Sequence, residues 1–95
     1  MDTLRSGWLT TGPKVKQFEE EFSALKQGQP CVAVNSCTSG ILISLQSLGL
    51  QPGDEVITTP MTFVSTVNSI IHAGGQVIFS DIQRGDMNLD PTQLE

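Results

Sequence analysis

The order of apolar runs and helical segments predicts an α/β fold with a mostly parallel sheet. Three apolar runs of strand length alternate with two segments of helical periodicity, which is the pattern of parallel βαβ units. We expect helices on both faces of the sheet, because parallel strands are normally covered on both sides. A chain of 95 residues makes one small domain at most. We interpret residues 1–95 as the N-terminal portion of a larger domain.

The composition excludes several classes of protein. With 38% hydrophobic and 16% charged residues, the chain is too apolar for an intrinsically disordered protein. Its net charge is −5 with only five Lys and Arg residues, which argues against a nucleic-acid-binding surface. No apolar run approaches the ~20 residues that span a membrane, and no signal peptide is recognisable. The two cysteines suggest neither a metal site nor a disulfide framework, so we expect a cytoplasmic protein.

The first predicted helix begins at Gly12-Pro13, because proline suits the first turn of a helix. It ends at Gly28, which tolerates the positive φ of a helix C-terminus. Four apolar residues at helical spacing form one stripe along it: Val15, Phe18, Phe22 and Leu25. We interpret Glu19–Glu21 as a solvated face. The preceding residues 5–11 form a polar lead-in that contains the one tryptophan.

A strand, a polar turn and a second helix are predicted next. Cys31–Val34 is a short apolar run of the kind that forms buried strands. The small and polar residues Asn35–Gly40 join it to a helix predicted over Ile41–Leu48, which Gly49 ends. Gln51–Asp54 carries the proline and glycine of a type II turn.

The remaining elements complete the alternating pattern. A second strand is predicted over Glu55–Thr58, and Pro60 ends it. Helical spacing resumes over residues 64–71 and stops at Gly74-Gly75, and Gln76–Asp81 is the third predicted strand.

Asp90 and Pro91 predict the start of one more helix, with aspartate as the N-cap and proline at the first helical position. The sequence stops at Glu95, within the first turns of that helix. This stop favours part of a larger α/β protein, and the alternative is a frayed natural C-terminus.

Residues 35–40 form a candidate phosphate cradle between the first strand and its helix. The first N–H groups of a helix have no partner inside the helix, and the helix dipole favours an anion there. Ser36, Thr38 and Ser39 add hydroxyl groups. The segment is neither a P-loop nor a GxGxxG fingerprint. A purely structural polar turn is the alternative.

Phe63 is a candidate ring-binding residue. It lies in the segment Thr59–Thr66, at the C-terminal end of the second strand, where open α/β sheets bind ligands. Its aromatic ring is suited to stacking on a flat heterocycle, and the alternative is a phenylalanine of the core. A phosphorylated aromatic ligand would need both this ring and the cradle.

Several segments together resemble the DegT/DnrJ/EryC1/StrS family of pyridoxal-phosphate (PLP) enzymes, which are mostly aminotransferases of nucleotide-linked keto-sugars. The matching segments follow one another in order along nearly the whole chain. The chain also resembles the members of the family that are devoted to surface and spore-coat polysaccharides. The segments that carry it are Ser6–Pro13, Phe18-Glu19, Ala33–Gly40, Pro52–Pro60, Thr62–Thr66 and Phe79–Ile82.

The resemblance implies the large domain of a fold-type I PLP enzyme, with a mostly parallel seven-stranded sheet. It assigns the cofactor phosphate to Cys37, Thr38 and Ser39, and stacking on the pyridine ring to Phe63. The family often has Gly or Ala in place of Cys37, which is either a reactive thiol or an inert small residue. Substrate binding is expected near Trp8 and Gly12, although simple packing would also explain Trp8.

The resemblance also implies what these residues lack. The Schiff-base lysine, the pyridine-binding aspartate and the small domain of the family would lie beyond Glu95. We therefore expect no catalytic residue in this chain, and three of its lysines do not match that setting: Lys14, Lys16 and Lys26. The isolated chain is expected to be inactive. In the complete enzyme, glutamate is the expected amino donor and a homodimer the expected assembly.

Two alternatives stay open. A sugar 3-dehydratase of the same family, in which histidine replaces the lysine, is not distinguished by residues 1–95. A chain that truly ends at Glu95 would be an inactive remnant or a binding module. The fold-type I strand order that the resemblance implies places later strands beside residues 31–35. In the isolated chain this segment would therefore lack its neighbouring strands, and the chain is expected to be marginally stable or prone to aggregation.

Overall fold

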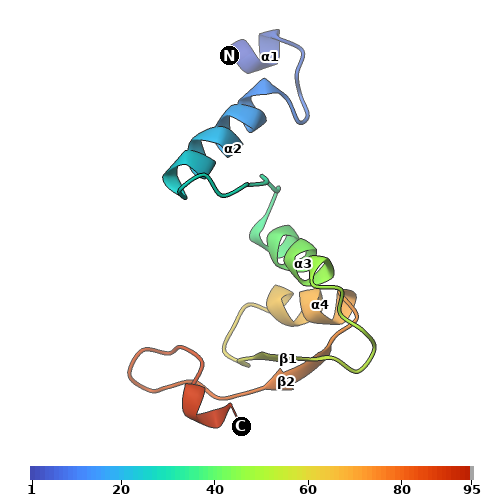
Figure 1. Ribbon diagram of the computed structural model, residues 1–95, viewed down its shortest axis with the longest axis vertical. Helices are drawn as coiled ribbons and strands as arrows, with labels where there is room; N and C mark the ends of the chain where they lie inside the picture. The colour runs from blue at the N-terminus through green and yellow to red at the C-terminus, as the bar shows by residue number, and fades with distance from the viewer. Residues whose placement is uncertain (95) are drawn as a thin grey trace. The chain divides into compact units, whose positions relative to one another are not determined.

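The computed structural model describes residues 1–94, which divide into two compact units. The first unit comprises Met1–Asn35 and the second begins at Ser36. Figure 1 gives the helices and strands of both units along the chain. No helix within residues 1–94 is long and apolar enough to cross a bilayer.

The first unit contains two helices, α1 (Asp2–Arg5) and α2 (Pro13–Leu25). Pro13 is the first residue of α2, as the sequence predicts. The helix ends at Leu25 in a Schellman-type turn, in which the N–H of Gly28 donates to the carbonyl of Ser23 at 2.9 Å. Both Gln27 and Gly28 have positive φ, 57° and 81°. The residue in the left-handed position next to the helix is therefore a glutamine.

The strand predicted over Cys31–Val34 is absent, and the segment is extended without regular structure. A strand exists only when a neighbour accepts and donates its backbone hydrogen bonds. Within residues 1–94, the one pair of strands is β1 with β2, and neither lies beside this segment in a ladder. The prediction of a strand at these residues is therefore wrong for this chain, whereas the expectation that residues 31–35 lack neighbouring strands agrees with the structure.

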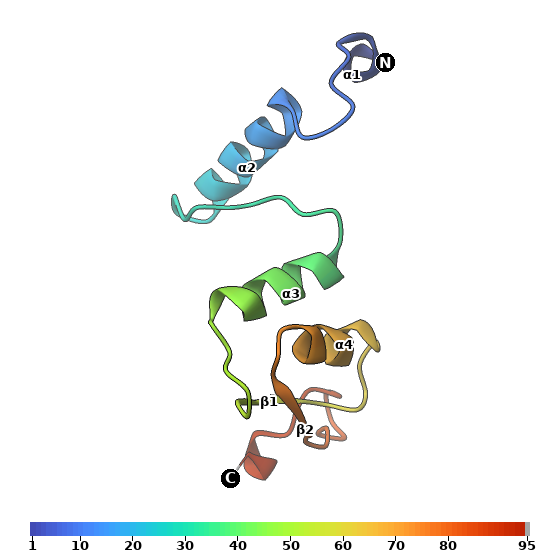
Figure 2. The ribbon, with the colours of Figure 1, turned by 90° about the vertical axis from the view of Figure 1, so that its right-hand side faces the viewer.

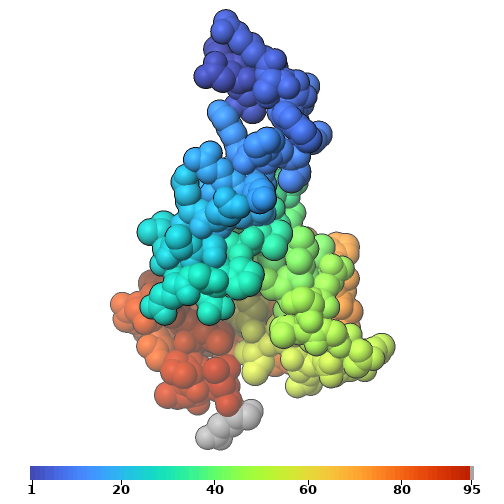
Figure 3. Space-filling model, turned by 45° about the horizontal axis from the view of Figure 1, so that its top comes forward, coloured from blue at the N-terminus to red at the C-terminus, as the bar shows by residue number. Residues whose placement is uncertain are grey.

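The second unit contains helix α3 (Cys37–Ser47), strand β1 (Glu55–Thr58), helix α4 (Ser65–His72) and strand β2 (Gln76–Phe79). The strands are parallel, with Val56 beside Val77. This arrangement confirms the predicted α/β class and parallel pairing. α4 packs on both strands and α3 packs on α4. Figure 2 shows both helices on the same side of the strands, and Figure 3 shows the surfaces of α3 and α4 in contact. The expected helical cover on both faces is therefore not found in residues 36–94.

The core of this unit is small. Ile70 is 2% exposed. In residues 1–94 it is the one hydrophobic residue that is buried. Gly75 lies against it, because a Cβ at this position would stand 3.2 Å from side-chain atoms of Ile70, Leu50 and Val56. α4 and β2 approach closely here because residue 75 has no side chain.

Element boundaries differ from the predictions by a few residues. α3 begins at Cys37, four residues before the expected start at Ile41, because the cap is formed by Ser36. β2 ends at Phe79 rather than Asp81, since the chain then turns into a loop closed by an antiparallel bridge between Ile82 and Leu89. β1 has the predicted bounds.

The last predicted helix is a single 3₁₀ turn, Pro91–Gln93. Asp90 is its N-cap, and its Oδ1 accepts hydrogen bonds from the Thr92 N–H at 3.0 Å and from the Thr92 hydroxyl at 2.8 Å. These two bonds lower the pKa of Asp90, with the hydroxyl bond the larger cause. The predicted cap is thus confirmed, although the helix it would begin is only three residues long.

Candidate functional site

The N-terminus of α3 is capped by Ser36. Ser36 has extended backbone angles, φ −159° and ψ 158°, and its Oγ accepts the N–H of Ser39 at 3.1 Å. The hydroxyls of Ser36 and Ser39 also lie 3.0 Å apart. We call residues 36–39 the cap turn. The serine cap explains why a polar turn, rather than an apolar one, can begin this helix.

Two backbone donors of the cap turn remain available. The N–H of Ser39 bonds to the Ser36 side chain and that of Gly40 to the Ser36 carbonyl at 3.1 Å. In residues 1–94, the N–H groups of Cys37 and Thr38 have no such acceptor, and both residues are exposed. They stand at the positive end of the dipole of an 11-residue helix. This geometry suits an anion such as a phosphate group.

Phe63 lies just before α4 and is 77% exposed. The interpretation as a core phenylalanine is therefore wrong for this structure. Hydrogen bonds fix the loop before and after Phe63 along the chain. Thr59 Oγ1 accepts the Met61 N–H at 3.1 Å, and the carbonyl of Phe63 accepts the Thr66 N–H at 3.0 Å. The aromatic face is left free to contact another flat ring.

The cap turn and Phe63 belong to the same end of the second unit. α3 and α4 pack side by side, and Figures 1 and 2 both show their N-termini at the same side of the unit. The loop that carries Phe63 leaves the C-terminal end of β1 at Thr58 on this side as well. The structure thus gathers the predicted phosphate-binding and ring-stacking residues at the C-terminal edge of the strands, the usual ligand edge of parallel sheets.

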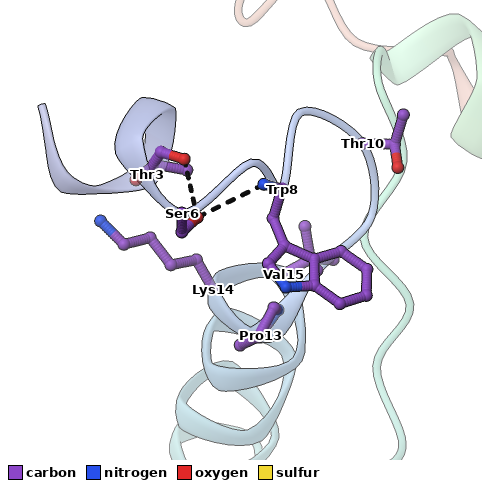
Figure 4. Close-up of a pocket in the computed structure, with 8 residues that line it drawn as sticks. Thr3, Ser6, Trp8, Thr10, Pro13, Lys14 and Val15 are labelled. Carbon is purple, nitrogen blue, oxygen red and sulfur yellow. Dashed lines mark hydrogen bonds between the residues drawn. The ribbon is translucent and has the colours of Figure 1, made fainter.

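Trp8 and Gly12 pack against each other in the first unit. A Cβ on Gly12 would lie 3.2 Å from Trp8 atoms, so a larger residue would displace the indole. Trp8 remains 53% exposed and borders a hollow of about 110 Å³, in which Figure 4 shows its ring facing Pro13 and Val15. This volume is below the ~300 Å³ of ordinary ligand pockets. The hollow is sized for a small group and not for a whole nucleotide sugar.

Glu19 is a residue whose role sequence analysis missed. It is half-buried rather than solvated, and its Oε1 accepts the N–H of Ala33 at 2.7 Å. It follows Val15 by four residues and precedes Phe22 by three, so it lies on the apolar face of α2. That spacing was a usable signal. It also borders a groove of about 400 Å³, which is lined by Phe18, Glu19, Phe22, Cys31, Val32, Ala33 and Val34.

No metal-binding site is found in residues 1–94. Residues 1–94 hold no group of three or more His, Cys, Asp or Glu side chains placed to bind a metal ion. Both cysteines are free, and Cys31 donates its thiol to the Gln29 carbonyl at 3.3 Å. His72 ends α4 on the surface, in the last turn.

Solved structures of similar sequence share this fold. Spr1654 of Streptococcus pneumoniae, a proposed sugar aminotransferase in its PMP form, is 41% identical with a TM-score of 0.89. The match covers 98% of this chain and 24% of Spr1654. NtdA of Bacillus subtilis with bound cofactor PMP is 36% identical with a TM-score of 0.91, and the match covers 98% of this chain and 21% of NtdA.

A dehydratase is among the similar structures as well. GDP-4-keto-6-deoxy-D-mannose-3-dehydratase of E. coli with bound hydrated PLP is 28% identical with a TM-score of 0.85, over 94% of this chain and 24% of that one. The similarity therefore spans both activities that the sequence leaves open.

Comparison of sequences gives the same family. The spore coat polysaccharide biosynthesis protein SpsC of Bacillus subtilis (strain 168) is 53% identical over 94 residues, which are 99% of this chain and 24% of SpsC. The chain thus spans about a quarter of the length of such relatives. The profile of the DegT/DnrJ/EryC1/StrS aminotransferase family matches residues 1–95. The resemblance seen in the sequence is confirmed, and the chain belongs to the DegT/DnrJ/EryC1/StrS aminotransferase family.

Proposed function

We propose that residues 1–95 are the cofactor-phosphate-binding, N-terminal part of a PLP-dependent aminotransferase of nucleotide-linked keto-sugars. The observation that carries the proposal is the cap turn, whose Cys37 and Thr38 N–H groups are open at the N-terminus of α3. The exposed ring of Phe63, which lies just before the N-terminus of α4, supports it. Family membership and the cofactors named for Spr1654 and NtdA point the same way.

Each residue has a separate task in this proposal. The N–H groups of Cys37 and Thr38 bind phosphate oxygens, and Ser39 contributes its hydroxyl. Phe63 stacks on the pyridine ring, which holds the ring plane in one orientation. When bound, PLP supplies the electron sink for amino-group transfer. The cap turn and Phe63 only bind and orient, because neither offers a lysine or a base.

Trp8 and Gly12 are proposed to contact the substrate. The exposed indole offers an apolar face with the hydroxyls of Ser6 and Thr10 around the same hollow. Because Gly12 has no side chain, the indole can lie flat against the start of α2. A small hydroxylated group of the substrate fits this hollow better than a complete nucleotide sugar.

The rest of the activity is assigned to residues outside this chain. The relatives are about four times as long, and we propose that the complete enzyme is a fold-type I protein in which the other parts supply the lysine and the small domain. A glutamate amino donor, a homodimer and a cytoplasmic location belong to the same proposal. By itself, the 95-residue chain is expected to bind cofactor phosphate without catalysis.

The test of phosphate binding uses pyridoxamine 5′-phosphate (PMP), which needs no lysine. We expect PMP, titrated into the ¹⁵N-labelled chain, to shift the backbone amide signals of Cys37 and Thr38. Pyridoxamine without the phosphate is the control and should leave both signals in place. Equal responses to the two compounds, or no response to PMP, would refute the phosphate assignment.

A second candidate function, the sugar 3-dehydratase, is favoured by the E. coli structure alone. The two differ at a residue beyond Glu95. Reading the coding frame past this position decides between them, because the aminotransferase requires a lysine where the dehydratase has a histidine. A stop codon directly after Glu95 would leave an inactive remnant or a binding module.

A further inference from the structure

The loop between β1 and α4, which carries Phe63, buries little apolar surface. Met61, Phe63 and Val64 each expose more than half of their surface in the described chain. Apolar burial is the main favourable term in packing a segment onto its domain. Because these side chains contribute little of it, the position of the Phe63 backbone depends on the hydrogen bonds around it.

A pair of threonine hydroxyls spans Phe63 along the chain. Thr62 Oγ1 and Thr66 Oγ1 lie 3.0 Å apart, and one of the two donates a hydrogen bond to the other. The N–H of Thr66 also donates to the Phe63 carbonyl at 3.0 Å. Thr66 is half-buried in the first turn of α4, and this helix packs on both strands. The pair therefore ties the loop to a helix that is itself held by the sheet.

The pair lies where α4 has no side-chain cap. Val64 occupies the N-cap position and makes no side-chain cap bond, whereas the hydroxyl of Ser36 caps α3. A cap bond normally fixes the entry of the chain into a helix. At α4 the bond between Thr62 and Thr66 provides the side-chain link between the loop and the first turn. Threonine suits this task, because its branched Cβ already restricts χ1 and little side-chain freedom is lost when the hydroxyls meet.

Restraint of the backbone at residue 63 affects how its ring can bind. The χ1 angles that a side chain can adopt depend on the φ and ψ angles of its own residue. A backbone held before and after Phe63 therefore limits the directions in which the exposed ring can point. A ring that is restricted beforehand loses less conformational freedom when a flat ligand stacks on it. Pre-organisation of this kind raises affinity without any new contact to the ligand.

We propose that Thr66, paired with Thr62, is a positioning residue for Phe63. The hydroxyl pair ties the loop to α4 and so orients the aromatic ring for stacking on the pyridine ring of the cofactor. Neither threonine contacts the cofactor. The inference rests on the proposed function, since it supports the ring-stacking role given there to Phe63. All three residues belong to the second unit.

The experiment titrates PMP into the ¹⁵N-labelled chain and follows two signals. The amide shifts of Cys37 and Thr38 measure affinity, and the pyridine-ring proton of PMP moves upfield when an aromatic face stacks on it. Phe63→Leu should abolish this upfield shift. Thr66→Val keeps the shape of the side chain but not its hydroxyl. We expect its upfield shift at saturation to be smaller and its affinity about two- to fivefold lower, the equivalent of one hydrogen bond between neutral groups.

Further variants test the hydroxyl itself. Thr66→Ser restores the hydroxyl and should restore most of both signals. Thr62→Val removes the other partner and should match Thr66→Val, and the double variant should be no worse than either single one. Ser47→Ala is the matched control, because it removes a hydroxyl that bonds to the Ser44 carbonyl at 2.7 Å in the last turn of α3. It should behave as wild type.

The outcomes separate the inference from the function beneath it. A wild-type upfield shift in Thr66→Val, or a Thr66→Ser variant that does not restore it, overturns the inference alone. Lower affinity with an unchanged upfield shift also overturns it, because the pair would then stabilise the unit without orienting the ring. So does an upfield shift that is absent from wild type or kept in Phe63→Leu.

Failure of the proposed function has a different signature. If PMP leaves the wild-type amides of Cys37 and Thr38 in place, the proposed function fails and the positioning role fails with it. Should the α4 amides show that Thr66→Val unfolds, Thr62→Val decides by the same readings, because Thr62 is exposed and its substitution disturbs no packing.

Discussion

Two four-residue segments that the sequence predicts as strands, Cys31–Val34 and Glu55–Thr58, have different outcomes in the structure. Residues 55–58 form β1, pair in parallel with β2 and lie against α4. Residues 31–34 stay extended and pair with no strand in the described chain, and the Ala33 N–H donates to the Glu19 carboxylate of α2. The difference shows that composition makes a segment suitable for a sheet, whereas a neighbouring strand makes it a strand.

The largest effect on stability is expected from a substitution in the packed core beside β1 and β2. Ile70→Ala removes the buried side chain between α4 and the strands, and should cost about 2–5 kcal/mol. A loss of this size is a large part of the stability of a small domain. We expect hydrogen-exchange protection of the β1 and β2 amides to collapse.

Val32→Ala is the matched control on the unpaired segment. Because Val32 is exposed, its truncation should change the free energy of unfolding by no more than about 0.5 kcal/mol. Similar losses of protection in both variants would contradict the comparison, since they would mean that the extended segment is as firmly packed as the sheet.

The same distinction explains what could be predicted from the sequence. Signals that act within a few residues were read correctly: Pro13 begins α2, Asp90 caps the turn at Pro91, and the bounds of β1 match. The binding roles of the cap turn and Phe63 stay predictions, which rest on local chemistry: a polar turn before a helix and an aromatic ring after the end of a strand. The missing strand at 31–34 depends on residues far along the chain. The spacing of Glu19 on α2 indicates the face on which it lies, but its partner Ala33 is 14 residues away and no local pattern encodes it.

Exposed apolar side chains bear on the stability expected of the chain. Phe18 and Phe22 stack with ring centroids 6.0 Å apart, and both remain accessible on α2. Lys26 covers part of the Phe22 ring, at 5.7 Å from its centroid. An apolar face of this kind favours association when nothing covers it. Marginal stability of the isolated chain therefore stays a prediction, which a sharp and cooperative thermal transition at low protein concentration would contradict.

A smaller effect on stability is expected at the end of α2, where the residue in the left-handed conformation next to the helix is not a glycine. Gln27 adopts a left-handed conformation that a glycine adopts without strain. Gln27→Gly should stabilise the helix end by about 0.5–1 kcal/mol, seen as slower exchange of the Lys26 and Gly28 amides. Gly28→Ala, in which φ is also positive, should act in the opposite direction. Slower exchange in both variants would show that backbone strain is not the cause.

The smallest effect concerns pH and the cap at Asp90. Hydrogen bonds from the Thr92 hydroxyl and N–H lower the pKa of Asp90 from its usual 3.8. A lowered pKa means that the folded turn favours the carboxylate, so its contribution is present above the ordinary pKa and is lost as pH falls through the lowered one. From about pH 4 down to about pH 2 we expect the Thr92 amide signal to move toward its unfolded position.

Asp90→Asn keeps a capping oxygen that does not titrate, so its Thr92 signal should stay constant over the same range. The cap is exposed to solvent, and added salt should weaken the wild-type response. A Thr92 signal that moves equally in both proteins would assign the change to another group, of which Asp86, with a pKa lowered mainly by the backbone N–H of Asn88, is the nearest candidate. A constant signal in both proteins would mean that the turn does not depend on its cap. Local hydrogen bonds would then contribute less to this turn than the correct prediction of the Asp90 cap suggests.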